Sequence, residues 1–181
     1  ISVVSETMPH LKRGAIRDFK AILADEWDDN AWNKSESIYT FPSGSIIEFF
    51  SADQPGKVHG PARDILFINE ANHLDYDTAR QLLVRTRLFA IFDYNPTHTF
   101  WVHENIAPRE NCRSIHSTYK DNDYLTAEQV AEIESNKNDA NWWRVYGEGK
   151  VGQLEGLIFP DFELCDTMPD AAGLREVYGM D

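Results

Sequence analysis

The sequence predicts an α/β fold, in which a mostly parallel β-sheet is flanked by helices and carries a β-hairpin. Short apolar runs typical of buried strands alternate along the chain with segments in which apolar residues recur at helical spacing. The run 65–68 is continuously apolar, which is typical of a strand buried on both faces of a parallel sheet. Residues 37–41 and 45–50 flank a Pro-Ser-Gly turn, which indicates the hairpin.

Each remaining element has a local reason. The apolar run 1–5 predicts a short buried strand, and Leu11, Ala15 and Phe19 recur at helical spacing, which predicts an amphipathic helix over 9–23. Prolines and glycines predict a loop over 51–63. Further along we expect a strand at 64–68, a helix over 77–88, strands at 89–92 and 114–117, and helices over 98–106, 126–134 and 138–146.

Composition excludes several classes of protein. The chain is 42% hydrophobic, so it can form a core and is not intrinsically disordered. No apolar run approaches the roughly 20 residues of a membrane span, and the strand-like start is unlike a signal peptide. Cys112 and Cys165 give neither a disulfide framework nor a zinc-binding spacing, which indicates a reducing cytoplasm. The formal charge of −13 argues against DNA binding over the whole surface but allows a local basic patch.

The strongest candidate site follows the strand at 64–68, where the sequence continues with Asn69 and Glu70. Ligands of α/β sheets bind at the carboxyl ends of parallel strands. Glu70 offers a carboxylate that could activate water, and Asn69 offers an uncharged amide oxygen to Mg²⁺. The alternative is a buried strand that simply ends in polar loop residues.

Two other segments could contact phosphate. Asn95 follows the strand predicted at 89–92 and could hydrogen-bond a phosphate or a catalytic water, although Asn-Pro is also an ordinary turn. Lys57, His59 and Arg63 lie in the glycine-containing loop before the strand at 64–68, where their charge could meet phosphate. The alternative for these three residues is a solvated surface loop.

The evidence for other metal sites in the sequence is weaker. Asp181 ends a short strand-like run at 177–181 and could supply one metal ligand, but one carboxylate does not make a site. His103 and His116 have no neighbours at ligand spacing, so surface or core positions explain them better.

The order of these motifs resembles the large terminase subunit of tailed bacteriophages and prophages along nearly the whole chain. The resemblance is carried, in chain order, by the hairpin strand 43–49, the loop 57–60, the strand end 68–72, Asp-Tyr-Asn-Pro at 93–96, Thr-Tyr-Lys-Asp-Asn at 118–122, Glu-Gly-Leu-Ile-Phe-Pro-Asp-Phe at 155–162 and Tyr-Gly-Met-Asp at 178–181. The last three motifs are more specific than the strand end.

This resemblance implies a P-loop NTPase-like (ASCE) ATPase domain that drives double-stranded DNA into the procapsid, followed by an RNase H-like nuclease domain. Residues 1–146 would form the later part of the ATPase domain, 147–176 a glycine-containing linker, and 177–181 the first nuclease strand. The implied ligands are ATP with Mg²⁺, and Mg²⁺ or Mn²⁺ at the nuclease site. The implied partners are a portal protein, the small terminase subunit and further copies in a ring, in the cytoplasm of a bacterial host.

The resemblance also implies roles for individual residues. Glu70 matches the catalytic glutamate of the Walker B motif, and Asn95 matches the motif that couples hydrolysis to movement. Asp181 matches the first metal-binding aspartate of the nuclease.

The sequence departs from the family pattern at three points. Asn69 stands where most relatives have Asp, which weakens the expected hold on Mg²⁺. His59 stands where relatives often have Arg, so Lys57 or Arg63 would take over a trans-acting role unless that role is lost. The phosphate-binding loop GxxxxGK[ST] is absent and is expected before Ile1.

We therefore expect the chain by itself neither to bind ATP tightly nor to hydrolyse it. Two alternatives to a motor ATPase remain at this stage. One is a degenerate prophage remnant that acts only as an interaction module, and the other is a helicase-like P-loop ATPase, which the terminal motifs disfavour.

Overall fold

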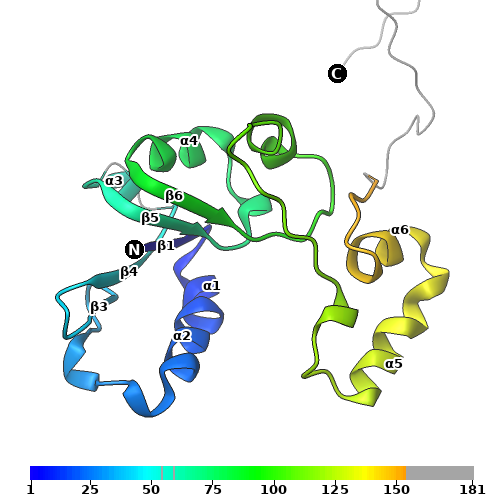
Figure 1. Cartoon of the computed structure of the whole chain (residues 1–181), viewed down its shortest axis with the longest axis horizontal. Helices are drawn as coiled ribbons and strands as arrows, with labels where there is room; N and C mark the ends of the chain where they lie inside the picture. The colour runs from blue at the N-terminus through cyan, green and yellow to red at the C-terminus, as the bar shows by residue number, and fades with distance from the viewer. Residues whose placement is uncertain (54, 59, 154–181) are drawn as a thin grey trace, which may run out of the picture.

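A mixed β-sheet with the strand order β2-β3-β4-β1-β5-β6 organises the fold. The computed structural model describes residues 1–53, 55–58 and 60–153 (Figure 1). The strands are β1 (Ser2–Ser5), β2 (Trp32–Asn33), β3 (Ile38–Thr40), β4 (Ile46–Ser51), β5 (Arg63–Ile68) and β6 (Thr86–Phe92). Because β4, β1, β5 and β6 run parallel to one another, the predicted mostly parallel α/β sheet is confirmed.

The predicted hairpin is also confirmed. Strands β3 and β4 pair antiparallel, with Tyr39 opposite Ile47. In the turn between them, the backbone N–H of Gly44 donates to the carbonyl of Phe41 at 2.8 Å. Gly44 has a φ of 83°, a conformation that glycine adopts without steric cost, which explains why this residue ends the turn.

Helices and helical turns connect the strands. The helices are α1 (Met8–Arg13), α2 (Ala15–Leu23), α3 (Pro55–Val58), α4 (Tyr76–Val84), α5 (Ala127–Ser135) and α6 (Ala140–Trp142). The 3₁₀-helices are η1 (Ala24–Glu26), η2 (Asp29–Ala31), η3 (Ala71–His73), η5 (Tyr119–Asp121) and η6 (Asn136–Asn138), and the π-helices are η4 (Val102–Ile106) and η7 (Trp143–Gly147).

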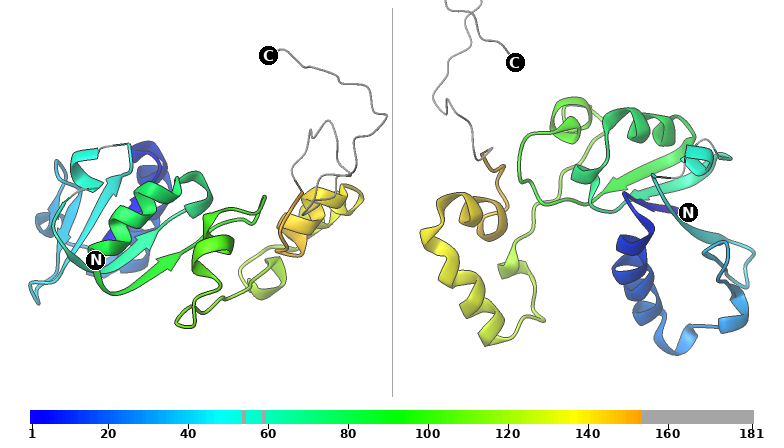
Figure 2. Two further views of the ribbon diagram at one scale, coloured as in Figure 1. Left: turned by 90° about the horizontal axis from the view of Figure 1, so that it is seen from above. Right: turned by 180° about the vertical axis from the view of Figure 1, so that it is seen from behind.

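The sheet has a hydrophobic core on each face. Helices α1 and α2 cover one face, where Leu11 and Ile16 pack with Val3 of β1 and Phe49 of β4. Helix α4 and the π-helix η4 cover the other face, and their buried side chains pack against β1, β4 and β5 (Figure 2). Alternate residues of β1 therefore enter different cores, as the two-residue period of a strand requires.

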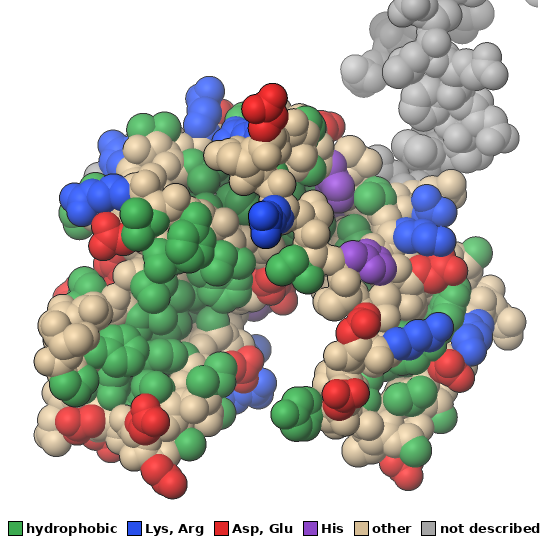
Figure 3. Space-filling model, viewed as in Figure 1, with side chains coloured by type: hydrophobic (Ala, Val, Ile, Leu, Met, Phe, Trp, Pro, Cys, Tyr) green, Lys and Arg blue, Asp and Glu red, His purple; other side chains and the backbone are tan. Residues whose placement is uncertain are grey.

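Strand β6 forms one edge of the sheet. Among the described residues it pairs only with β5. Three of its large hydrophobic side chains, Leu88, Phe89 and Ile91, are 48–70% exposed. Hydrophobic side chains accordingly extend over this part of the molecule (Figure 3). An edge strand with exposed apolar residues is open to pairing with another strand along its outer side.

Beyond β6 the chain forms a small helical segment beside the sheet (Figure 1). Helix α5 starts with the predicted capping box, because the Thr126 hydroxyl accepts from the backbone of Gln129 and the Gln129 side chain accepts from the backbone of Thr126. The segment returns at Gly152 to the chain that follows β6, because the backbone N–H of Gly152 donates to the carbonyl of Pro96 at 2.8 Å.

Several predicted boundaries were wrong. The helix expected over 9–23 is divided at Gly14, which has φ and ψ of −103°. The helix expected over 77–88 ends at Val84, and the strand expected at 89–92 begins earlier, at Thr86, because residues from Thr86 onward pair with β5. Long-range pairing thus overrides the local helical spacing.

Elements expected further along are also changed. The segment 114–117 is irregular rather than a strand, and the helix expected over 98–106 is shortened to the π-helix η4. The predicted nuclease strand at 177–181 lies outside the described residues. Over the described ranges, no helix has the length and apolar character needed to cross a membrane.

Candidate functional site

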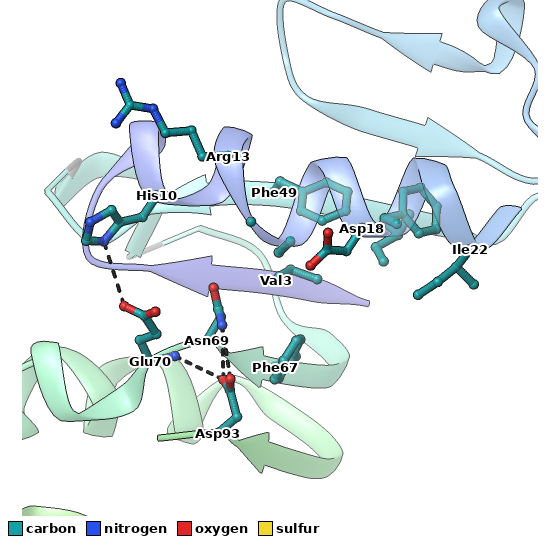
Figure 4. Close-up of a pocket in the computed structure, with 14 residues that line it drawn as sticks. Val3, His10, Arg13, Asp18, Ile22, Phe49, Phe67, Asn69, Glu70 and Asp93 are labelled. Carbon is teal, nitrogen blue, oxygen red and sulfur yellow. Dashed lines mark hydrogen bonds and ion pairs between the residues drawn. The ribbon is translucent and has the colours of Figure 1, made fainter. Parts of the chain in front are cut away.

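The carboxyl ends of β5 and β6 bring three polar residues together. Asn69 and Glu70 directly follow β5, and Asp93 directly follows β6 (Figure 4). The side-chain amide of Asn69 donates to both carboxylate oxygens of Asp93, at 3.2 and 3.1 Å. The backbone N–H of Glu70 donates to the same carboxylate at 2.9 Å. Asp93 therefore ties the two strand ends into one polar edge.

The backbone of Glu70 is fixed by this arrangement. Glu70 has φ 55° and ψ 57°, the left-handed region that residues with a Cβ seldom adopt. Hydrogen bonds on both sides hold this conformation, because Asp93 accepts from Glu70 through its carboxylate and from the Ala71 backbone through its carbonyl, at 2.8 Å. The turn directs the Glu70 side chain away from Asp93 (Figure 4), and strained residues of this kind cluster at functional sites.

The Asp93 carboxyl has an unusual electrostatic environment. Its desolvation raises its pKa above the ordinary value, although the residue keeps some exposed surface. The hydrogen bonds from the Glu70 backbone and the Asn69 side chain favour the charged form and act in the opposite direction, while the nearby Glu70 carboxylate raises the pKa further. A cation bound at this edge would offset both the desolvation of the Asp93 carboxylate and its repulsion by Glu70.

Two histidines and a second glutamate surround the Glu70 carboxylate. Its Oε2 lies 3.3 Å from His73 Nδ1 and 4.0 Å from His10 Nδ1. His73 Nδ1 is also 3.9 Å from Oε2 of Glu6, the residue that follows β1. The Glu70 side chain is 46% exposed, so water can reach it while these neighbours limit its movement.

The polar edge opens into a cavity of about 620 Å³ between the sheet and helices α1 and α2. Its walls are largely apolar, with Phe19 from α2 and Phe49 from β4, and its polar end consists of Asn69, Glu70 and Asp93. An apolar cavity with a few convergent polar groups is the usual form of a small-molecule site. This edge is therefore the best candidate for chemistry in the described part of the chain.

Asn95 occupies a different position from the three edge residues. It is exposed in the segment after β6, where its carbonyl accepts from the Thr97 backbone at 2.8 Å. It lines a second, wider hollow of about 1070 Å³, and Asp93 borders both hollows. Asn95 thus lies in the segment that follows β6, and its coupling role stays a prediction.

Of the three basic residues predicted to meet phosphate, Arg63 is separated from the edge. Arg63 begins β5, at the end opposite Glu70, and is 6% exposed. Its guanidinium donates through Nε to the Ser2 hydroxyl at 3.0 Å and through Nη1 to the carbonyl of Leu82 at 3.0 Å. Lys57 lies in α3, and His59 and Asp181 lie outside the described residues. In this structure the Arg63 donors are used within the fold.

The sequence did not single out Asp93, Glu6, His10 or His73. Asp93 had a usable signal, because it follows β6 as directly as Asn69 follows β5. The other three residues carry no spacing that links them, since β1 and β5 are brought together only by folding.

The sheet and its edge define a class of protein, namely an α/β protein with a candidate ligand site at the carboxyl ends of neighbouring parallel strands. The family model described as "Terminase large subunit, T4likevirus-type, N-terminal" matches residues 12–165. This chain therefore belongs to the family of phage large terminase subunits and corresponds to part of their N-terminal region.

Individual relatives agree with this assignment. The large terminase subunit of Escherichia phage T5 is 26% identical over 157 residues, which cover 81% of this chain and 36% of the T5 protein. The large terminase of the thermophilic bacteriophage D6E has the same fold, with a TM-score of 0.69 at 18% identity over 84% of this chain and 40% of the D6E chain.

A second D6E structure, in complex with ADP, gives a TM-score of 0.65 at 18% identity over 83% of this chain and 40% of that chain. The chain thus spans well under half the length of these relatives.

Proposed function

We propose that this chain is the later part of the DNA-packaging ATPase domain of a phage large terminase, and that Glu70 is its catalytic base. The observation that carries the proposal is the Asn69–Asp93–Glu70 arrangement at the ends of two parallel strands. The D6E large terminase, which shares this fold, has been solved with ADP. A nucleotide at the corresponding edge of this sheet would meet the Glu70 carboxylate.

The proposed chemistry is water attack on the terminal phosphate of ATP. Glu70 accepts a proton from the water as the water oxygen bonds to the γ-phosphorus and the bond to the ADP oxygen breaks. The left-handed backbone of Glu70 and its contacts with His73 and His10 hold the carboxylate at the cavity mouth. Positioning of the nucleophile accounts for much of the catalysis in phosphoryl transfer.

Asn69 and Asp93 fit the Mg²⁺ that accompanies ATP. Magnesium prefers oxygen ligands and keeps several waters, so one or two protein oxygens suffice. Because the Asn69 Nδ2 donates to Asp93, the amide oxygen is left for a cation. Asp93 supplies the negative charge that Asn69 lacks, and bound Mg²⁺ would neutralise the phosphate oxygens during transfer.

The remaining residue roles complete this proposal. Asn95 would sense the phosphate state from the segment after β6 and pass this state to the parts that grip DNA. Lys57 and His59 would approach the nucleotide of a neighbouring subunit, and Arg63 would fix the end of their loop through its buried hydrogen bonds. Asp181 would be the first ligand for Mg²⁺ or Mn²⁺ in the nuclease domain.

In the whole protein, residues 1–146 would belong to the ATPase, 147–176 to a linker and 177–181 to the nuclease. Copies would form a ring on the portal protein, receive double-stranded DNA with the small terminase subunit, and work in the cytoplasm of the bacterial host. Terminase family membership supports this setting.

The test is ATP turnover by the intact terminase that carries this segment. Glu70→Gln keeps the size of the side chain and removes the base, so we expect kcat to fall about 100-fold or more. Glu132→Gln, at an exposed position on α5, is the matched control and should leave kcat unchanged. Equal turnover by the Glu70→Gln protein and the wild type would refute the assignment of Glu70.

The same measurement separates a motor from an interaction module. The neutral Asn69 at the expected Mg²⁺ position is the observation that favours a degenerate, non-hydrolysing protein. Such a protein would bind its portal or small-subunit partner without any turnover of ATP. Turnover in the wild type excludes it.

A further inference from the structure

A cluster of nitrogen and oxygen ligands lies beside the proposed ATPase residues. In the proposed hydrolysis its histidines only hold the Glu70 carboxylate in place. Glu6 follows β1 and His10 lies in α1, while His73 ends the turn η3 after β5. Strands β1 and β5 are parallel neighbours, with Val4 opposite Ile68, so both chain segments leave the sheet at the same edge. Folding therefore assembles a group that is scattered over more than sixty positions of the sequence.

The geometry of the cluster is close to that of a metal site. One ligand atom from each of Glu6, His10 and His73 lies within 4.8 Å of the other two. The Glu70 Oε2 is 3.3 and 4.0 Å from the two imidazole Nδ1 atoms. Four ligands around tetrahedral zinc, at bonds of about 2.0–2.1 Å, are separated by about 3.4 Å. Small rotations of exposed side chains would bring these atoms to that spacing.

We propose that Glu6, His10 and His73 bind a zinc ion, with water as the fourth ligand. Two imidazole nitrogens with carboxylate oxygens select zinc over magnesium, which prefers an octahedral set of oxygens. The oxygen-only pair Asn69 and Asp93 suits magnesium instead. The two cations would therefore have different ligands on this edge.

The backbone around the cluster is well supported. The carbonyl of Glu6 accepts from the backbone of Asp53 at 3.3 Å, and the His73 backbone donates to the Glu70 carbonyl at 3.0 Å. His10 precedes Leu11, which is fully buried in the core under α1. Binding would thus require side-chain rotation on a fixed scaffold, which lowers the entropy cost of forming the site.

Ion pairs between protonated histidines and glutamates would give similar distances without any metal, and direct binding separates the two explanations. Zinc chloride is titrated into the full chain in a calorimeter with excess Mg²⁺ present. We expect one zinc per chain. His10→Ala and His73→Ala should each weaken binding on the order of tenfold or more, and Glu6→Gln, which keeps the side-chain shape, should also weaken it. His98→Ala, a histidine elsewhere on the surface, should bind as the wild type does.

Cobalt provides a second readout. Co²⁺ in the wild-type chain should give the strong visible absorption of a four-coordinate site, and this absorption should be lost in His73→Ala. Absence of zinc binding in the wild type would overturn the proposal, as would wild-type affinity in both the His10→Ala and His73→Ala chains. These measurements need no ATP turnover, so their result is independent of the proposed ATPase.

Discussion

The Asn69 side-chain amide donates to both carboxylate oxygens of Asp93, at 3.2 and 3.1 Å, across the ends of β5 and β6. An aspartate at position 69 would instead place a second carboxylate against the first. The neutral residue at this position is therefore matched to its partner, and the negative charge at the strand ends is carried by Asp93. The departure of Asn69 from the usual family residue thus has a structural explanation.

Asn69→Asp should make the fold less stable at neutral pH and more responsive to Mg²⁺. It replaces two hydrogen bonds with like-charge repulsion at short range, and we expect a loss on the order of 1–2 kcal/mol. Urea denaturation with and without Mg²⁺ measures both effects. Asn69→Ala is the control, because it loses the hydrogen bonds without adding charge and should gain nothing from Mg²⁺. Equal responses of the two variants to Mg²⁺ would contradict this prediction.

Arg63→Ala should destabilise the protein by about 2–3 kcal/mol, because it removes hydrogen bonds from a charged donor and leaves a space in a buried region. The Arg63 side chain contacts Ser2 and the carbonyl of Leu82 and is 6% exposed. Arg87→Ala is the comparison, since Arg87 is exposed and makes one 3.4 Å contact with Asp64. It should change the free energy of unfolding by less than about 0.5 kcal/mol. Similar losses for the two variants would show that the buried network contributes little.

Asp75 should make α4 sensitive to acid. The backbone N–H of Thr78 donates to its carboxylate, and this hydrogen bond is the main reason that the pKa of Asp75 lies below its ordinary value. A lowered folded-state pKa stabilises the fold above the unfolded pKa, and this stabilisation is lost as pH falls through the folded value. The free energy of unfolding, measured from about pH 6 down to about pH 2, should show this loss.

Two variants isolate the effect of Asp75. Asp75→Asn keeps the N-cap but cannot titrate, so its stability should fall less steeply in acid. Asp75→Ala should lose about 1 kcal/mol already at neutral pH. An Asp75→Asn protein with the full acid sensitivity of the wild type would place the titrating group elsewhere.

Gly152→Ala should loosen the helical segment from the sheet. A Cβ at Gly152 would lie 2.5 Å from the carbonyl oxygen of Thr97 and 2.6 Å from Cγ2 of Val145. Relief of these clashes should cost about 1–3 kcal/mol and speed hydrogen exchange in α5 and α6 more than in the sheet. Gly56→Ala is the matched control, because nothing lies within 4 Å of its Cβ position. Unchanged exchange in α5 would mean that Gly152 does not hold the segment.

The sequence by itself determined the features that depend on neighbouring residues. The turn at Gly44, the capping box at Thr126 and the strand that ends at Ile68 were all predicted, since each depends on residues a few positions apart. The same local information gave the α/β class and the position of Glu70 at a strand end, and its motif order indicated the terminase family.

Tertiary structure alone decided which strands are neighbours. That choice set the boundary between α4 and β6, because Thr86 pairs with β5 although local spacing favours helix. It joined Asp93 to Asn69, and it brought His10 to the Glu70 carboxylate. The physical reason is that parallel pairing joins residues far apart in the chain, and no local periodicity records which carboxyl ends will share an edge.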